Sequence, residues 1–357
     1  SREFQCESSS DVLERLASTG LMVYALNMHK SSHQSVEPIE QASPALSERR
    51  IVLKFGSRLL TGDSAELDPE RMASVARAVA AEPKTEAVIV SSGAIAAGFR
   101  ILGHASPPKR IQDRQAAAAV GQGRLMSLWD DAFRAVGLKL AQVLLTNDCL
   151  TDRRRYIAAS RALGTLLTAG VVPIVNENDT VSVDEIVVGD NDNLAAATAT
   201  LVDADVLALL TDVPGVMTGD PARDPASQVI PKAASADELR QYCFQKKAVE
   251  SKGGMITKLE AAERAGQFGI PTMIASGLDE DVLAAIVRGE PAGTVISAAE
   301  RPLGARRHWM AMQMNLTGAL VVDDGAVTAI RQRASLLPRG VVRVEGRFRR
   351  GDLISVI

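Results

Sequence analysis

The feature that most constrains the fold is a repeated alternation of short apolar runs with helical stretches. The runs at 51–55 and 87–90 are typical of buried strands, and the segments between strands place apolar residues on one face, as amphipathic helices do. This alternation predicts a mainly parallel sheet between layers of helices, an α/β three-layer αβα sandwich. Further strands are predicted at 138–146, 171–176, 206–211 and 272–275, and helices at 68–81, 114–136, 154–169 and 258–268.

Polar side chains follow several of these predicted strands directly. The carboxyl ends of parallel strands meet at one edge of a sheet, which is where ligands bind in open α/β folds. Four such tails together are less expected by chance than any one of them, so the sequence predicts a ligand site at this edge. The tails are Lys54-Phe55-Gly56-Ser57, Ser91-Ser92-Gly93, Asn176-Glu177-Asn178-Asp179 and Thr211-Asp212.

The segment Gly189-Asp190-Asn191-Asp192-Asn193 packs two carboxylates and two carboxamides into four residues after a glycine. Carboxylates this close repel one another and need partners such as lysines, a metal or an ammonium group. An ordinary polar turn is the alternative interpretation. The residues 195–201 are predicted to be helical, with Asn193 as the N-cap.

Two lysines lie beside glycine turns. Lys54 precedes Gly56, and Lys258 follows Gly253-Gly254, while neither a Walker loop nor a Gly-x-Gly-x-x-Gly turn follows the first strand. Two lysines that converge on a phosphoryl group would neutralise charge in its transfer, and a carboxylate would hold both in place. Each feature alone also fits a solvated lysine or a helix-entry turn.

Taken together, these segments resemble the amino acid kinase family and, within it, the glutamate kinases, over about residues 51–357. Other members of the family act on different acids and carry different residues in these loops. An amino acid kinase with another acid substrate, and a catalytically dead RNA-binding or regulatory protein, are the competing hypotheses. The most specific pieces are 91–98, 176–179, 189–194, 210–212 and 253–255.

The resemblance implies ATP-dependent phosphorylation of the γ-carboxylate of L-glutamate to L-glutamyl 5-phosphate, the first step of proline synthesis. Lys54 and Lys258 would stabilise the transferring phosphoryl group, and Asp192 would orient both lysines. The γ-carboxylate is already a nucleophile near neutral pH, so no general base is expected. The glutamate-binding residues would be Ser92, Asp179 and Asn191, with Asp190 beside them.

The resemblance also implies a nucleotide site. Gly56 and Ser57 would donate N–H groups to phosphate, and Thr211 and Asp212 would lie near the nucleotide. Mg²⁺ would arrive with ATP and bridge its phosphates, so no metal site built from protein ligands is expected. The phosphates would be covered by Lys252, Gly253, Gly254, Met255, Ile256, Thr257 and Lys258.

One departure from the family lies in this loop. Bacterial members usually carry Gly-Thr-Gly-Gly-Met, whereas this chain has Ser251-Lys252-Gly253-Gly254-Met255. Lys252 adds a positive charge next to the phosphates. This charge would either tighten nucleotide binding or be a neutral variation.

The predicted domain organisation has four parts. Residues 1–48 lack periodicity and form an extension, with a short helix predicted around 11–17 and no basic region typical of a signal peptide. The kinase domain spans 49–298 and a basic linker spans 299–317. The β-rich segment 318–357 resembles the start of a PUA domain, a module often found in RNA-modifying enzymes. Its arginines are interpreted as a solvated basic face in preference to a nucleic-acid footprint.

Composition and charge argue against some of the remaining classes of function. The net charge of −3 argues against nucleic acid as the main ligand, and no apolar run approaches the length that crosses a bilayer. Three widely spaced cysteines form no metal pattern and suit a reducing compartment, so a cytoplasmic location is predicted. The resemblance further implies a homo-oligomer, a dimer or tetramer, and feedback inhibition by proline.

Overall fold

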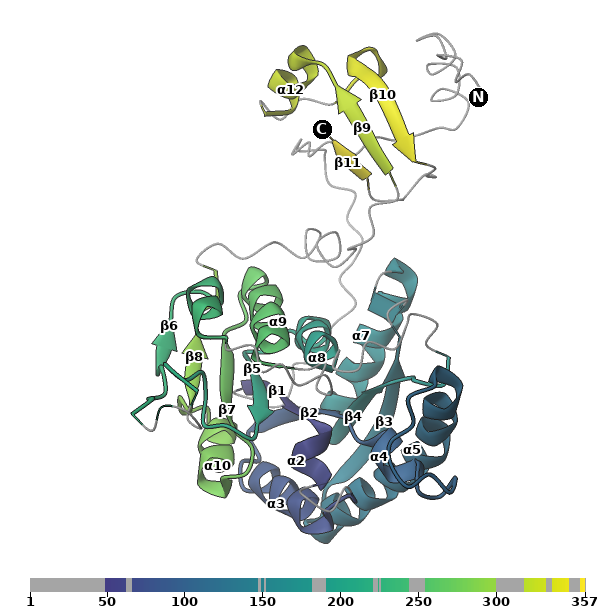
Figure 1. Cartoon of the computed structure of the whole chain (residues 1–357), viewed down its shortest axis with the longest axis vertical. Helices are drawn as coiled ribbons and strands as arrows, with labels where there is room; N and C mark the ends of the chain where they lie inside the picture. The colour runs from purple at the N-terminus through teal and green to yellow at the C-terminus, as the bar shows by residue number, and fades with distance from the viewer. Residues whose placement is uncertain are drawn as a thin grey trace. The chain divides into compact units, whose positions relative to one another are not determined.

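The chain divides into two compact units in the computed structural model (Figure 1). The larger unit spans 42–312 and the smaller joins 1–41 with 313–357, and each is described by itself. The structure describes residues 49–61, 66–146, 149–150, 152–181, 191–220, 224, 226–243, 254–299, 318–331, 336–346 and 354–356.

The larger unit is built on an eight-stranded sheet in the order β3-β4-β2-β1-β5-β7-β8-β6. Every neighbouring pair is parallel except β7 and β8, which are antiparallel. This confirms the predicted mainly parallel sheet. The strands are β1 (Arg49–Phe55), β2 (Thr85–Ser91), β3 (Lys139–Leu145), β4 (Val171–Glu177), β5 (Val206–Thr211), β6 (Lys232–Ala233), β7 (Thr272–Ser276) and β8 (Thr294–Ile296).

Helices cover both faces of this sheet, which gives the three layers that the sequence predicts (Figure 1). One layer includes α3 (Pro69–Ala80), α5 (Ile111–Ala135) and α10 (Glu280–Arg288). The other includes α7 (Arg153–Thr168), α8 (Asn191–Leu201) and α9 (Met255–Gln267). Shorter elements are α2 (Ser57–Thr61), α4 (Ala94–Gly98) and the 3₁₀ helix η2 (Asp237–Tyr242).

The alternation of side chains along β1 decides where its polar residue points. Successive residues of a strand face opposite sides of the sheet. Ile51, Leu53 and Phe55 pack in the core beneath α3, α5 and α10, whereas Val52 packs in the core beneath α7, α8 and α9. Lys54 therefore faces the layer of α8 and α9.

Aspartate side chains cap the starts of α3, α7 and α10. The α3 helix begins at Pro69 because the Asp68 side chain accepts hydrogen bonds from the backbone of Glu70 and Arg71. The predicted start of α8 is wrong. That helix begins at Asn191, so Asn193 lies in its first turn and is not its N-cap. The earlier start places Asp192 inside the helix, where buried ion pairs hold it.

The smaller unit contains a three-stranded sheet in the order β10 (Val341–Gly346), β9 (Gly318–Val322) and β11 (Ile354–Val356). The strands fall within the predicted β-rich segment, but helix α12 (Asp324–Arg331) was not predicted from the sequence. The Asp323 carboxylate starts this helix by accepting a hydrogen bond from the Ala326 N–H at 2.7 Å. Leu320, Ala326 and Leu336 form its small core, next to the short 3₁₀ helix η3 (Pro338–Gly340).

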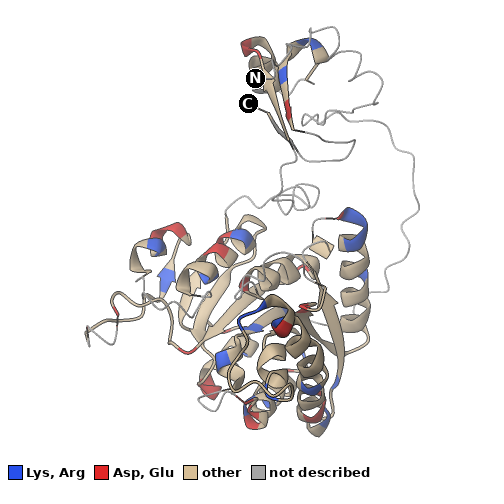
Figure 2. Ribbon diagram, turned by 45° about the vertical axis from the view of Figure 1, so that its right-hand side comes forward, with Lys and Arg blue, Asp and Glu red and all other residues tan. Residues whose placement is uncertain are grey.

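Some predictions fall outside the described residues. These are the extension 1–48 with its helix at 11–17, nearly all of the linker 299–317, and three site residues, Asp190, Lys252 and Gly253. In the described part of the larger unit, charged side chains gather on the outer helices and loops, and the central strands carry few (Figure 2).

Candidate active site

The charged residues that are buried in the described part of the protein form one cluster. Among the described residues, the only charged ones that are buried are Lys54, Asp192 and Lys258. Lys54 comes from β1, the strand that pairs with β2 on one side and β5 on the other. Asp192 lies in the first turn of α8, and Lys258 in the first turn and a half of α9. Buried charges are costly unless they are paired, so the three elements must bring them together.

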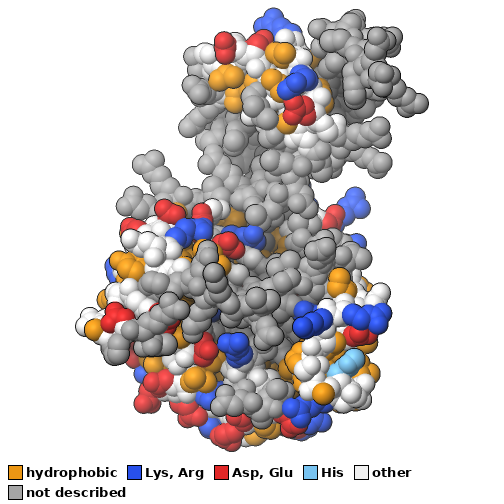
Figure 3. Space-filling view, viewed as in Figure 1, with side chains coloured by type: hydrophobic (Ala, Val, Ile, Leu, Met, Phe, Trp, Pro, Cys, Tyr) orange, Lys and Arg blue, Asp and Glu red, His pale blue; other side chains and the backbone are white. Residues whose placement is uncertain are grey.

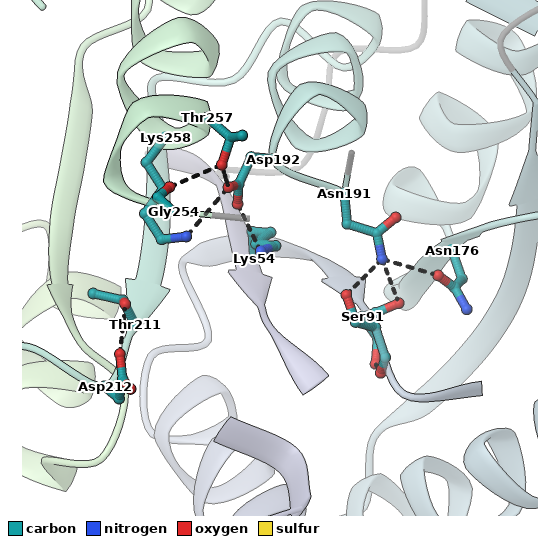
Figure 4. Close-up of polar contacts among 11 residues, drawn as sticks. Lys54, Ser91, Asn176, Asn191, Asp192, Thr211, Asp212, Gly254, Thr257 and Lys258 are labelled. Carbon is teal, nitrogen blue, oxygen red and sulfur yellow. Dashed lines mark hydrogen bonds and ion pairs between the residues drawn. The ribbon is translucent and has the colours of Figure 1, made fainter. Parts of the chain in front are cut away.

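The carboxylate of Asp192 joins both lysines (Figure 4). Its Oδ1 lies 2.6 Å from the Nζ of Lys54, and its Oδ2 lies 3.2 Å from the Nζ of Lys258. The Thr257 hydroxyl also lies within hydrogen-bond distance of Asp192 Oδ2, at 2.8 Å. A single carboxylate therefore fixes two ammonium groups that come from different elements.

The electrostatics of this cluster favour an additional anion. Burial, together with the charge of Lys258, lowers the pKa of Lys54, while Asp192 partly opposes this shift. Burial would raise the pKa of Asp192, but the charges of Lys54 and Lys258 outweigh it and hold that pKa below its usual value. Two ammonium groups and one carboxylate leave an excess of positive charge, which suits a phosphoryl group.

Polar groups on the β2 and β4 side form a chain of hydrogen bonds that ends at α8. Asn191 Nδ2 donates to Ser92 Oγ at 2.6 Å and to Asn176 Oδ1 at 3.2 Å. Asn176 Nδ2 in turn donates to Gln122 Oε1 at 2.9 Å. The Glu177 backbone N–H, which can only donate, also contacts Asn176 Oδ1 at 2.9 Å and so fixes the amide orientation of Asn176.

Asp179 lies two residues beyond the end of β4. Burial and the neighbouring Glu177 raise the pKa of its carboxyl from 3.8 to about 6, and Arg114 of α5 opposes the shift. Asp179 is therefore a partly buried acid that ionises just below neutral pH. A substrate ammonium group would stabilise its ionised form.

The β5 side of the cluster carries the residues predicted to bind nucleotide. The Thr211 hydroxyl donates to the Asp212 carboxylate at 3.1 Å at the end of β5. Met255, Ile256 and Thr257 form the first turn of α9, which Gly254 precedes, so their backbone N–H groups lie at a helix N-terminus, where anions bind. Gly56 and Ser57 stand at the junction of β1 and α2, one strand away from Thr211.

The strand order divides the site into three parts. Ser92 directly follows β2, and Asn176 is the second-last residue of β4. Thr211 ends β5, and Lys54 lies on β1, which stands between β2 and β5 in the sheet. Figure 4 shows the same arrangement, with the lysine–aspartate cluster between Thr211–Asp212 and the Asn191–Ser91–Asn176 group. Two molecules, one bound on the β5 side and one on the β2–β4 side, would meet at the lysines.

Sequence reasoning missed three polar residues of this region. Asn176 belongs to a segment singled out in the sequence, but it was not assigned a binding role. Gln122 and Arg114 lie inside the long helix α5, where polar residues normally face solvent. No local pattern in the sequence distinguishes them, because the groups with which they interact, Asn176 in β4 and Asp179 beyond its end, lie far away in the chain.

Comparisons with known proteins agree with this geometry. The sequence matches the amino acid kinase family over residues 49–276 and the PUA domain over residues 318–357. The chain belongs to the amino acid kinase family, a class of phosphotransferases built on this sandwich.

Individual related proteins indicate to which group of this family the chain belongs. The chain is 48% identical over 312 residues to the glutamate 5-kinase of Azoarcus sp., covering 86% of this chain and 84% of the relative. It is 45% identical over 312 residues to the glutamate 5-kinase of Geobacter metallireducens, with the same coverage. Within the family, the chain belongs with the glutamate 5-kinases. Among the described residues, no helix is long and apolar enough to cross a membrane.

Proposed function

We propose that this protein transfers the γ-phosphate of ATP to the γ-carboxylate of L-glutamate, giving L-glutamyl 5-phosphate and ADP in the first step of proline biosynthesis. The observation that carries this proposal is the cluster of Lys54, Asp192 and Lys258, the only buried charged residues among those described. The cluster lies between a set of amide and carboxylate groups and a helix N-terminus. Membership among the glutamate 5-kinases supports the identity of the acid.

The proposed reaction needs positioning and charge neutralisation more than proton transfer. Ser92, Asn191 and Asp179 hold glutamate, with Asp179 taking its ammonium group. An oxygen of the γ-carboxylate attacks the γ-phosphorus, forming a new P–O bond while the bond to the β-phosphate oxygen breaks and ADP leaves. Lys54 and Lys258 neutralise the charge on the transferring group, and Asp192 keeps both lysines in place. Asp190 is proposed to lie beside the glutamate.

ATP is proposed to lie on the β5 side. Gly56, Ser57, Thr211 and Asp212 line the nucleotide, and residues 252–258 cover its phosphates. Mg²⁺ bound with ATP would withdraw charge from the phosphate oxygens. The described residues contain no group of three or more His, Cys, Asp or Glu side chains that could hold a metal ion. Because Mg²⁺ in kinases keeps few protein ligands and binds substrate phosphates, the ATP phosphates are proposed to supply most ligands of this Mg²⁺.

The remaining expectations are proposals of the same kind. The protein is proposed to act in the cytoplasm as a dimer or tetramer, with domain boundaries at 49–298 and 318–357. Proline has the carbon skeleton of a cyclised glutamate, so it is proposed to inhibit by competing at the acid site. Proline should then raise the apparent KM for glutamate.

A coupled assay of ADP release tests the function directly. We expect release with L-glutamate and Mg·ATP, and little release with L-aspartate or N-acetylglutamate. Lys258→Ala should lose activity by several orders of magnitude, because it removes a charge that stabilises the transition state. Lys232→Ala is the matched control, since Lys232 is exposed on β6. Full activity in Lys258→Ala, with the fold intact by circular dichroism, would refute the proposed role.

A further inference from the structure

Helix α5 contributes a wall to the acid side of the site. Ala117, Ala118, Gly121 and Leu125 form the buried stripe of this helix. Gln122 lies beside the stripe, and its bond to Asn176 docks the helix against the end of β4. Gln122 and Arg114 both interact with residues at or just beyond the end of β4, where the site residues of that strand lie.

Arg114 belongs to the same stripe, three and four residues before Ala117 and Ala118. Its Nε is buried and has no hydrogen-bond partner among the described residues. The charges of Arg114 and Asp179 act on each other, yet within the described part of the chain the two side chains form no direct ion pair. A purely structural arginine would be expected to close that contact, since buried donors are normally satisfied.

We propose that Arg114 binds the α-carboxylate of the amino-acid substrate. This inference rests on the proposed function. An α-amino acid carries an ammonium and a carboxylate on one carbon, so its recognition needs an anion and a cation that are close but not paired with each other. Asp179 and Arg114 meet this requirement, and a guanidinium suits a carboxylate because it donates two parallel hydrogen bonds.

The arrangement of the site also decides which carboxylate Arg114 takes. The hydrogen-bond chain from Gln122 through Asn176 reaches Asn191, whose neighbour Asp192 holds the lysines. Asp179 lies three residues after Asn176, past the end of β4, and its charge acts on Arg114. The γ-carboxylate therefore belongs at the lysines, and the α-carbon with both of its charged groups belongs near Asp179 and Arg114.

Steady-state kinetics of Arg114→Met test this assignment. The KM for L-glutamate should rise on the order of 10- to 100-fold, the range expected for losing hydrogen bonds to a charged group. The kcat and the KM for ATP should change little, because the lysine cluster is untouched. The KM of Arg114→Lys for L-glutamate should lie between those of the wild type and Arg114→Met, since lysine keeps the charge but loses the planar donor pair. Arg124→Met is the matched control, because Arg124 is exposed on the same helix.

A substrate analogue separates binding from a general loss of structure. In L-glutamate α-amide the α-carboxylate is replaced by a neutral amide, while the ammonium group and γ-carboxylate remain. Its competitive inhibition constant should be nearly the same for the wild-type enzyme and Arg114→Met. An unchanged KM for glutamate in Arg114→Met, or equal weakening of glutamate and its α-amide, would overturn the assignment. Absence of glutamate-dependent ADP release in the wild-type enzyme would instead refute the proposed function.

Discussion

Two carboxylates of the site, Asp192 and Asp179, show how neighbouring charges decide the outcome of burial. Burial raises the pKa of both groups. At Asp192 two lysines within ion-pair distance reverse the shift, whereas at Asp179 the neighbouring Glu177 adds to it. Asp192 therefore remains ionised beside the lysines, and Asp179 is left as a carboxyl group that becomes protonated below about pH 6. The opposite pKa shifts fit the different roles proposed for these residues: Asp192 fixes the lysines, and Asp179 receives the substrate ammonium group.

The raised pKa of Asp179 predicts how glutamate binding depends on pH. Only the ionised carboxylate attracts an ammonium group, and the pKa of about 6 places its protonation well above the usual 3.8. The KM for glutamate should be constant above pH 7 and should rise by about tenfold per pH unit below pH 6. Initial rates between pH 5 and 8 measure this, and the KM for ATP is the internal control.

The Asp179→Asn variant checks the sign of the same shift. A raised pKa means that ionising Asp179 costs folding free energy, and this cost is absent below pH 3.8 and complete above about pH 6. Asp179→Asn should therefore unfold at a higher temperature than the wild type at pH 8, with this gain disappearing near pH 4. A wild-type KM that stays constant down to pH 5 would contradict the role of Asp179 in binding the ammonium.

At the scale of elements, the position of Gln122 and Arg114 depends on how closely α4 and α5 cross. A Cβ atom added at Gly121 would lie 1.9 Å from the carbonyl oxygen of Ala94, and one at Gly98 would lie 2.0 Å from that of Ala117. The helices thus meet backbone to backbone, which only glycine permits. This close approach holds α5 at the depth from which Gln122 reaches Asn176.

Substitution of Gly121 should therefore disturb both stability and substrate binding. Gly121→Ala should lower the free energy of unfolding by at least about 1–3 kcal/mol, because the methyl group forces the helices apart. The KM for glutamate should rise in the folded fraction, since α5 carries Gln122. Urea unfolding and steady-state kinetics measure the two effects.

Gly123 offers a control on the same helix. A Cβ atom there meets nothing within 4 Å, so Gly123→Ala should stabilise the protein by up to about 1 kcal/mol through helix propensity alone. Equal stability of Gly121→Ala and Gly123→Ala would show that the crossing is not a tight constraint.

The elements also show what a sequence can and cannot reveal. Apolar runs and polar strand ends predicted the sheet and the four polar tails at its strand ends, because both signals are local. The start of α8 was misplaced from Asn191 to Ala195, since the lysines that hold Asp192 in the helix lie far away in the chain. Gln122 and Arg114 were missed for the same reason. Helix α12 was missed because it is short and contains Gly325.

At the scale of the whole molecule, the chain has separate hydrophobic cores. Two clusters of buried residues, all within residues 51–296, pack on the two faces of the large sheet. The third, around Leu320, contains only residues of the smaller unit. On the described part of the face in Figure 3, basic and acidic side chains are interspersed, with no broad basic patch of the kind that binds nucleic acid. The described residues of the candidate site and the two cores that support it lie in the larger unit.

This separation predicts that residues 42–312 fold and catalyse without the smaller unit. Lys54, Asp192, Lys258 and every described partner of the acid side lie within this range. A protein comprising 42–312 should keep the kcat and both KM values of the full chain, measured by ADP release under identical conditions. Loss of activity in a fragment that still unfolds cooperatively would mean that the smaller unit contributes to the active site. A fragment that fails to fold would mean that the two cores are energetically coupled, contrary to the separation of their contacts.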